Sequence, residues 1–241
     1  MKERPILFSA PMVRAILEGR KTVTRRVVKL PHANQLGEWE PTTVSGTDAR
    51  GIYHPEQAAI WHTRTGDCFT CPLGVPGDRL WVRETWQYFG FSDEGEPCIC
   101  YLADHGREWP NVPQSEADKV DCIWADLSDS GNFSISERAC DNRWRPSIHM
   151  PRWASRITLK VTGVRVERLQ DIDEGSCWDE GVESWLEIEA NLPRYSDGTP
   201  AKYNGEIQAF AAMWDQINGA GSWDANPWVW VVEFRRMESA P

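Results

Sequence analysis

The order of short strand-like and helix-like segments is the feature that most constrains the fold of this 241-residue chain. Apolar runs and alternations typical of strands occur at 5–8, 22–27, 79–86, 98–102, 155–168 and 228–235. Helical periodicity occurs at 9–18, 171–182 and 205–217. These segments follow no regular strand–helix–strand rhythm, and the chain has no glycine-rich phosphate loop, which argues against a doubly wound parallel sheet. We predict an α+β fold with a mostly antiparallel sheet or small β-barrel and flanking helices.

Capping residues indicate where two of the predicted helices begin and end. Ser9 can cap the first helix, and Gly19 is a natural residue just past its end. Lys21 therefore falls in the junction between this helix and the strand that follows it. Asp171 or Asp173 can cap the second helix, because a side-chain oxygen there accepts from the free backbone N–H groups of the first turn.

Three stretches lack any sustained period, and we predict that they are irregular insertions into a single domain covering 1–241. They lie at about 29–75, 103–154 and 186–204. No stretch approaches the roughly 20 apolar residues of a membrane span. The opening Met-Lys-Glu-Arg-Pro also lacks the apolar run of a signal peptide. We expect a cytoplasmic protein without a membrane partner.

Seven cysteines make an odd number, which argues against a disulfide scaffold in a cytoplasmic chain. Cys68 lies close to Cys71, and Cys98 lies close to Cys100, so a zinc site built from these four is conceivable. However, Cys-x-Cys is not the usual second half of such a site, and no histidine lies at ligand spacing beside either pair. We therefore favour free or core cysteines and predict no metal and no cofactor, with zinc as the alternative.

The basic residues are concentrated in two windows, although the formal net charge is −10. Residues 11–30 hold six basic side chains and one acidic one, and residues 143–168 hold seven and one. In an acidic protein, this concentration of cations predicts one positively charged site, which would attract an anion locally. The alternative is two solvated strands with basic outer faces.

The segment from Gly19 to Arg26, Gly-Arg-Lys-Thr-Val-Thr-Arg-Arg, is the strongest local signal. A helix end followed by a basic, hydroxyl-bearing strand can hold a phosphate or the polar edge of a base. It can also hold a reacting pair, because a lysine amine with a depressed pKa can take the proton of a threonine hydroxyl. Lys21 and Thr24 are that candidate pair, and a merely basic strand edge is the alternative.

Three segments together resemble the ASCH family: Ile6–Arg26, Gly77–Glu84 (Gly-Asp-Arg-Leu-Trp-Val-Arg-Glu) and Asn226–Phe234 (Asn-Pro-Trp-Val-Trp-Val-Val-Glu-Phe). The resemblance covers about half of the chain. It implies a β-barrel domain similar to the PUA RNA-binding fold. The closing segment is similar to the final strand of longer members that phages and prophages often carry.

One bacterial branch of this family, the amidohydrolases that release acetate from N4-acetylcytidine, is similar at the reacting positions. That similarity implies Lys21, Thr24 and Glu180 as catalytic residues, with Glu174, Asp179 and Glu183 as competitors for the carboxylate. We predict further substrate contacts from Arg20, Arg26, Trp81, Arg83 and Glu84. Because residues 21 and 24 would face opposite sides of a regular strand, Lys21 must lie in the preceding turn.

Cations interleaved with aromatic residues before the 155–168 strand are typical of a surface for single-stranded nucleic acid. The residues predicted to bind nucleic acid are Arg25, Arg145, Arg152, Trp153 and Arg156. An aromatic loop that packs against the fold, with arginines reaching outward, is the alternative. The expected partner is a modified nucleoside or RNA. The rival functions are a non-catalytic RNA- or single-stranded nucleic-acid-binding module and, third, a ribonuclease.

Overall fold

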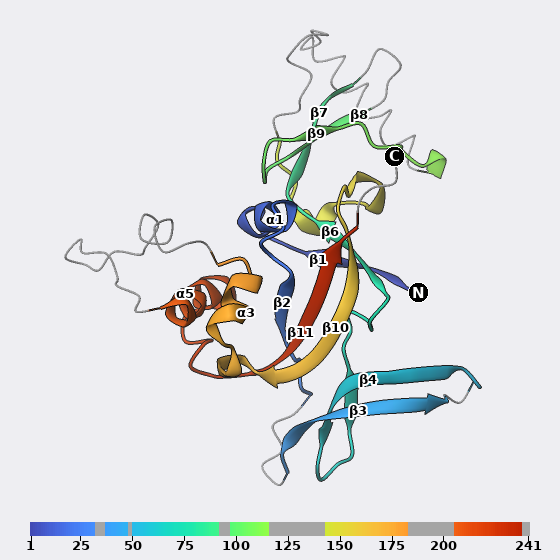
Figure 1. The fold of residues 1–241 in the computed structure, drawn as a ribbon. Helices are drawn as coiled ribbons and strands as arrows, with labels where there is room; N and C mark the ends of the chain where they lie inside the picture. Colours follow the sequence, from blue (N-terminus) through green and yellow to red (C-terminus); the bar gives the residue numbers. More distant parts are fainter. Residues whose placement is uncertain (32–36, 48–49, 92–96, 116–142, 183–204, 238–241) are drawn as a thin grey trace, which may run out of the picture. The chain divides into compact units, whose positions relative to one another are not determined.

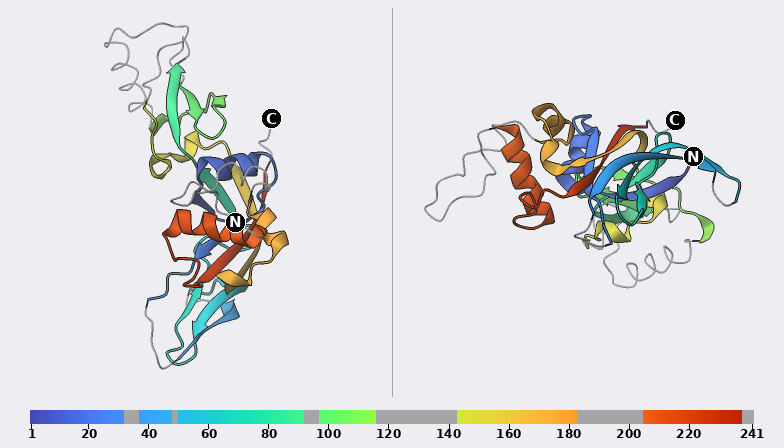
Figure 2. Two further views of the ribbon diagram at one scale, coloured as in Figure 1. Left: turned by 90° about the vertical axis from the view of Figure 1, so that its left-hand side faces the viewer. Right: turned by 90° about the horizontal axis from the view of Figure 1, so that it is seen from below.

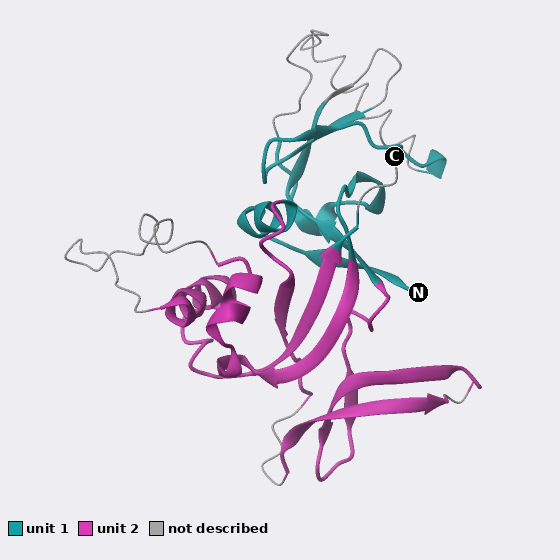
Figure 3. Cartoon of the chain, viewed as in Figure 1, with its two compact units in different colours: residues 1–17, 79–159, 236–241 teal, residues 18–78, 160–235 magenta. Residues whose placement is uncertain are grey.

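The computed structural model describes residues 1–31, 37–47, 50–91, 97–115, 143–182 and 205–237 (Figure 1). The described chain is α+β, with mostly antiparallel sheets and few helices. It divides into two compact units, coloured separately in Figure 3. The first unit comprises 1–17, 79–159 and 236–241, and the second comprises 18–78 and 160–235. Neither unit is continuous in sequence.

In the first unit, β1 (Glu3–Leu7) pairs in parallel with β6 (Arg79–Arg83). The unit also contains α1 (Ala10–Leu17) and an antiparallel sheet of β7 (Trp86–Phe91), β8 (Pro97–Tyr101) and β9 (Arg107–Glu108). Two 3-10 turns, η1 (Ser147–His149) and η2 (Arg152–Ala154), follow. Side chains from this sheet and the turns form one apolar cluster, made of Trp86, Tyr88, Ile99, Tyr101, Met150 and Ala154 with Trp153 packed against it.

In the second unit, three strands lie in the order β10, β11, β2. They are β10 (Thr158–Arg168, of which residues from Lys160 belong to this unit), β11 (Trp228–Arg236) and β2 (Val23–Val27), and β11 runs antiparallel to β2. The 3-10 turn η3 (Leu169–Asp171) leads into α3 (Glu174–Asp179), which lies beside α5 (Glu206–Asn218) (Figure 1, Figure 2). The two helices, β2 and β11 share one apolar cluster: Val23, Leu169, Ile172, Cys177, Val182, Ala209, Phe210, Trp214, Val229 and Val231. Burial of these side chains is the main force that holds α3 against β2.

The prediction that residues 29–75 lack regular structure was wrong. It forms an antiparallel sheet of β3 (Trp39–Thr47), β4 (Tyr53–His62) and β5 (Cys68–Thr70). Much of β3 and the first half of β4 is exposed. A strand shows alternating hydrophobicity only when one face is buried, so this ribbon carries no period that sequence analysis can detect.

Gly37 precedes this ribbon and lies directly against the buried imidazole of His62. A Cβ at residue 37 would be 2.6 Å from His62 Cε1 and 2.9 Å from Arg64 Cβ. The ring has no room to yield, because it is fully buried and its Nδ1 accepts from the backbone N–H of Thr65 at 3.1 Å.

We therefore expect Gly37→Ala to lower the free energy of unfolding by about 1–3 kcal/mol, the usual cost of overpacking. Urea unfolding of the variant and the wild type measures this change in the free energy of unfolding. Gly175→Ala is the matched control, because Gly175 is helical and its nearest neighbouring atom would be at an ordinary 3.5 Å. Equal stability of the two variants would contradict the predicted clash.

Ser9 lies at the start of α1, where its backbone carbonyl accepts from Val13 N–H at 2.9 Å. Gly19, just past the end of this helix, has a positive φ of 77°, as predicted. Asp173 is the residue that caps α3, since its side chain accepts from Ser176 N–H at 2.6 Å. The helix ends at Asp179, earlier than the predicted 182. Among the described residues, no helix combines the length and apolarity needed to cross a membrane.

Candidate active site

Lys21 lies in the turn before β2, as the proposed chemistry requires. The turn is anchored on both sides: Thr22 N–H donates to the Asp179 carbonyl at 2.9 Å, and Phe234 N–H donates to the Thr22 carbonyl at 2.8 Å. These bonds tie residue 22 to the end of α3 and to β11. Because Lys21 precedes the strand, the alternation of β2 does not set the direction of its side chain.

The amine of Lys21 is held by both the side chain and the backbone of Glu180. Nζ lies 2.6 Å from Oε2 and donates to the Glu180 carbonyl oxygen at 2.8 Å. The side chain of Lys21 is 0% exposed and that of Glu180 is 4% exposed. The structure thus brings together the amine and the carboxylate that the family resemblance paired across 159 positions of sequence.

The competing carboxylates occupy other positions. Glu174 is exposed in the first turn of α3. The side chain of Asp179 accepts a hydrogen bond from the Thr22 hydroxyl at 3.1 Å. Glu183 lies outside the described residues. Among the described candidates, Glu180 is therefore the carboxylate in contact with the Lys21 amine.

Burial lowers the pKa of Lys21 from its ordinary value of 10.5. The negative charge and hydrogen bond of Glu180 oppose this shift, whereas the positive charges of Arg26 and Arg25 reinforce it. Arg26 is half-buried, and burial also lowers the pKa of its guanidinium. This environment favours a neutral amine more than water does, which is what a lysine needs to act as a base.

Thr24 is buried in the middle of β2, opposite Val232 of β11. The structure gives its hydroxyl no hydrogen bond to another residue in the described part of the chain. Alternation along β2 places Thr24 and Arg26 on one face, and Val23 and Arg25 on the other. The hydroxyl oxygen is therefore uncommitted among the described groups.

Arg25, predicted to bind nucleic acid, is instead buried in an ion-pair network. Its side chain is 1% exposed. Nη1 lies 3.2 Å from Glu180 Oε1, while Nε and Nη2 lie 3.0 and 2.7 Å from Glu167 Oε1. Sequence analysis missed Glu167, although it is the one acidic residue in the basic window 143–168. The central position of residue 25 in β2 gives it a role inside the unit rather than on a surface.

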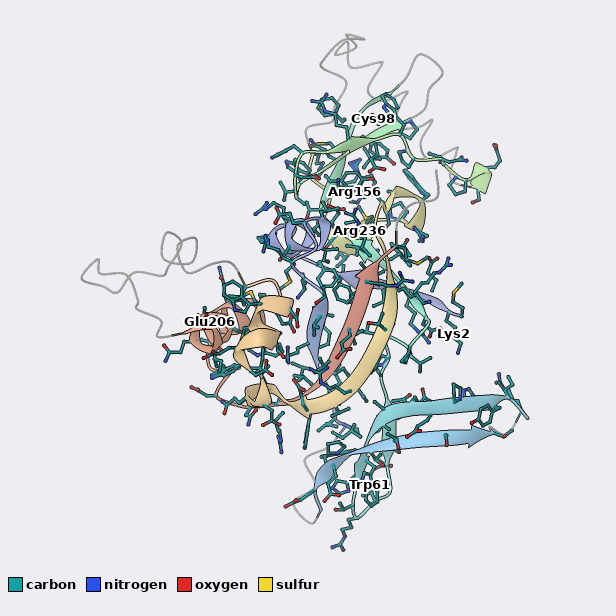
Figure 4. The ribbon with its side chains drawn as sticks, viewed as in Figure 1. Lys2, Trp61, Cys98, Arg156, Glu206 and Arg236 are labelled. Atoms are coloured by element: carbon teal, nitrogen blue, oxygen red, sulfur yellow. The ribbon has the colours of Figure 1, made fainter. Side chains whose placement is uncertain are left out.

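Arg156 and Glu84 are likewise committed to each other inside the first unit. The guanidinium of Arg156, labelled in Figure 4, lies 3.0 Å from Glu84 Oε1 through Nε and 2.8 Å from Asp104 Oδ1 through Nη2. It also lies 4.0 Å from the centre of the Tyr101 ring. Burial raises the pKa of Glu84, and the Arg156 hydrogen bond opposes that shift. The structure therefore places Arg156 and Glu84 in a buried ion pair with each other.

The ring of Trp81, predicted to bind substrate by base stacking, is flanked by two guanidinium groups. Arg83 lies 5.4 Å and Arg152 lies 5.8 Å from the ring centre. Arg83 Nε also donates to the Met150 carbonyl at 3.1 Å, and Arg152 forms an exposed ion pair with Glu3. A base that stacks on Trp81 would compete with these cations for the ring.

The other predicted nucleic-acid residues of the first unit belong to an aromatic cluster. The guanidinium of Arg145 lies 5.5 Å from the Trp86 ring and 4.8 Å from the Tyr88 ring. Trp153 packs edge-on against Trp86, with ring centres 6.2 Å apart. Trp153 therefore fits the predicted alternative, an aromatic loop that packs against the fold.

Arg20, predicted to contact substrate, lies in the second unit. It is exposed and pairs with Glu18 at 2.8 Å.

None of the described cysteines forms a disulfide with another described cysteine. Cys68 is exposed and Cys71 is buried in the second unit, whereas Cys98 and Cys100 are buried in the first. Burial raises the pKa of Cys98 and Cys100. In the described ranges, no group of three or more histidine, cysteine or acidic side chains is placed to hold a metal ion.

Comparison of the chain with models of protein families, with curated proteins and with solved structures finds no match.

Proposed function

We propose that this protein is an amidohydrolase that removes the acyl group from N4-acylated cytosine, as in N4-acetylcytidine. We also propose that its fold is the PUA-like barrel of the ASCH family. The observation that carries the proposal is the buried contact between the Lys21 amine and Glu180. The lowered pKa of this amine and the buried hydroxyl of Thr24, three residues along the chain, support it.

In the first step, the neutral amine of Lys21 takes the proton of Thr24, and the Thr24 oxygen bonds to the acyl carbon. Glu180 orients the amine for this transfer, because it holds Nζ from two directions. The acyl oxygen becomes an oxyanion. Arg26 or backbone N–H groups of the Gly19–Lys21 turn are the donors we propose for it.

In the second step, the bond between the acyl carbon and N4 breaks. N4 takes the proton back from the Lys21 ammonium and leaves as the amino group of cytosine. Acyl-Thr24 remains. Lys21 then deprotonates a water molecule that attacks this ester, so acetate leaves and the Thr24 hydroxyl regains its proton. Each proton that Lys21 accepts is returned, and no external co-reactant other than water is needed.

Buried ion pairs of two predicted nucleic-acid-binding arginines favour the enzyme over a non-catalytic RNA-binding module. Such a module needs cations that can pair with phosphates, and its affinity falls steeply as salt rises. Two of the predicted nucleic-acid residues, Arg25 and Arg156, are instead held by buried carboxylates. The same ion pairs speak against a ribonuclease that grips an RNA backbone through these residues.

Paired substitutions of Thr24 and Thr22 test the proposal. We expect Thr24→Val to reduce acetate release from N4-acetylcytidine by at least about 10²-fold, because it removes the nucleophilic oxygen without changing side-chain shape. Thr22→Val removes a hydroxyl two residues away that bonds to the exposed Asp179, so we expect activity within about twofold of the wild type. Quantifying acetate at saturating substrate gives both values.

Equal activity of the Thr24→Val variant and the wild type would overturn the nucleophile assignment. If the wild type releases no acetate but retards short RNA in a gel, the binding module replaces the enzyme. Thr24→Ser serves as the conservative variant and is expected to retain measurable turnover, since it keeps the oxygen.

A further inference from the structure

The carboxylate of Glu180 is shared between two cations, one on each oxygen. Oε2 lies 2.6 Å from the Lys21 amine, and Oε1 lies 3.2 Å from Arg25 Nη1. All three side chains are at least 96% buried. A carboxylate gripped on both oxygens cannot rotate without breaking one of its charged hydrogen bonds. The position of Oε2 at the amine therefore depends on what holds Oε1.

Beyond Arg25, the ion pairs continue in alternating charge toward the surface. Glu167 accepts from Arg25 through Oε1 and from Arg165 Nε through Oε2, the latter at 3.0 Å. Arg165 in turn pairs with Glu233. Side-chain exposure rises along this series from 1% at Arg25 to 17% at Glu167 and 42% at Arg165. Glu167 thus holds Arg25 in place, and Arg165 in turn holds Glu167.

We propose that Arg25 is a positioning residue: it holds Glu180 with Oε2 on the Lys21 amine, and Glu167 holds Arg25 in place. This inference rests on the proposed deacylation and deepens it. The rigid fork of a guanidinium suits the task, because Nε and Nη2 can bind Glu167 while Nη1 binds Glu180. A lysine at this position has a single ammonium and cannot hold two carboxylates in that geometry.

The charge of Arg25 adds a measurable effect on the base. The charged groups that act on the Lys21 amine are Glu180, Arg26 and Arg25. Loss of the Arg25 cation removes a repulsion that disfavours the ammonium form, and it leaves Glu180 to act on Lys21 alone. Both effects raise the pKa of Lys21. In the pH profile of kcat/KM, activity rises as the amine becomes neutral. This rising limb must therefore move to higher pH.

The test compares Arg25→Gln with the wild type, using N4-acetylcytidine turnover and nuclear magnetic resonance titration of the Lys21 side chain. We expect kcat at neutral pH to fall at least about tenfold with KM within about twofold, and the rising limb to move up by about one pH unit. The resonance titration should show the same upward shift. Arg168→Gln is the control, since Arg168 donates to the Asn226 carbonyl and lies outside this network.

Two milder variants keep the test decisive if Arg25→Gln does not fold. Glu167→Gln should lower kcat with KM little changed, because Arg25 loses its anchor, and Arg25→Lys should keep the cation yet lose kcat. A folded Arg25→Gln variant whose pH limb and Lys21 titration match the wild type, or a folded Glu167→Gln variant with the kcat of the wild type, overturns the inference, even if the wild type is an active deacylase. A wild type without turnover overturns the proposed function, while the Lys21 titration still decides whether Arg25 acts on the amine.

Discussion

Replacing Lys21 by methionine is expected to abolish acetate release, with kcat reduced by about 10⁴-fold. This lies at the upper end of the range for proton-transfer catalysis, because one amine acts as the base in the attack and as the acid for the leaving group. Methionine keeps most of the volume of the lysine side chain, so a core cavity does not explain the loss. Single-turnover acetate release measures the remaining rate.

Lys21→Arg separates the base from the cation. Arginine keeps the charge beside Glu180 but does not lose its proton in proteins, so we expect this variant to fold and to be as inactive as Lys21→Met. In the wild type, kcat/KM should rise with pH through a pKa below the ordinary 10.5 of lysine, since burial lowers it. More than a tenth of wild-type activity in Lys21→Arg would remove Lys21 from the reaction.

The largest expected loss of stability follows from replacing Arg156 by methionine. The guanidinium neutralises Glu84, whose side chain is 2% exposed, and it also binds Asp104. Removing the cation leaves a buried carboxylate without its partner, which costs about 3–5 kcal/mol of unfolding free energy. Urea unfolding at neutral pH measures the difference. Arg152→Met is the matched control, because its ion pair with Glu3 is exposed and is worth about 0–1 kcal/mol.

The deficit of the Arg156→Met variant should depend on pH in a defined direction. Burial already raises the pKa of Glu84, and loss of Arg156 removes the hydrogen bond and charge that oppose this shift. A carboxyl group whose pKa is higher in the folded state favours folding at low pH and disfavours it as pH rises through that pKa. The deficit should therefore be small in mild acid and grow toward neutral pH. A deficit that does not change with pH would contradict this account of Glu84.

Much of the fold could be predicted because most core elements bury one face. The strands β2, β10 and β11 and the helix α5 carry apolar residues at the expected periods. In the second unit, β2, β11 and α5 pack into one apolar cluster, and β10 lies beside β11 in the sheet. The β3–β4 ribbon could not be predicted in this way, because pairing between β3 and the exposed first half of β4 is held by backbone hydrogen bonds that leave no hydrophobic period. Residues 116–142 and 183–204, where two of the predicted insertions fall in part or whole, lie outside the described residues.

At the candidate site, a motif places Lys21 in a turn, but charge alone does not reveal which acid meets which cation. Arg25 looked like a surface residue because Arg20, Lys21 and Arg26 are also basic. Its burial depends on Glu167 and Glu180, which approach it only through the tertiary fold. The same holds for Arg156, whose partner Glu84 lies 72 positions away. Long-range ion pairs of this kind convert a basic sequence window into a neutral interior.

The discontinuous sheet of the second unit bears on how the protein reaches its native state during synthesis. β2 ends at Val27, but the strand that pairs with it, β11, begins at Trp228. A nascent chain on the ribosome therefore carries Thr24 and Arg25 on a strand with an unsatisfied edge until residues 228–236 have been translated. Contacts so distant in sequence are slow to form. Assembly of the candidate site therefore waits for β11, and β2 depends on protection from aggregation until that strand is available.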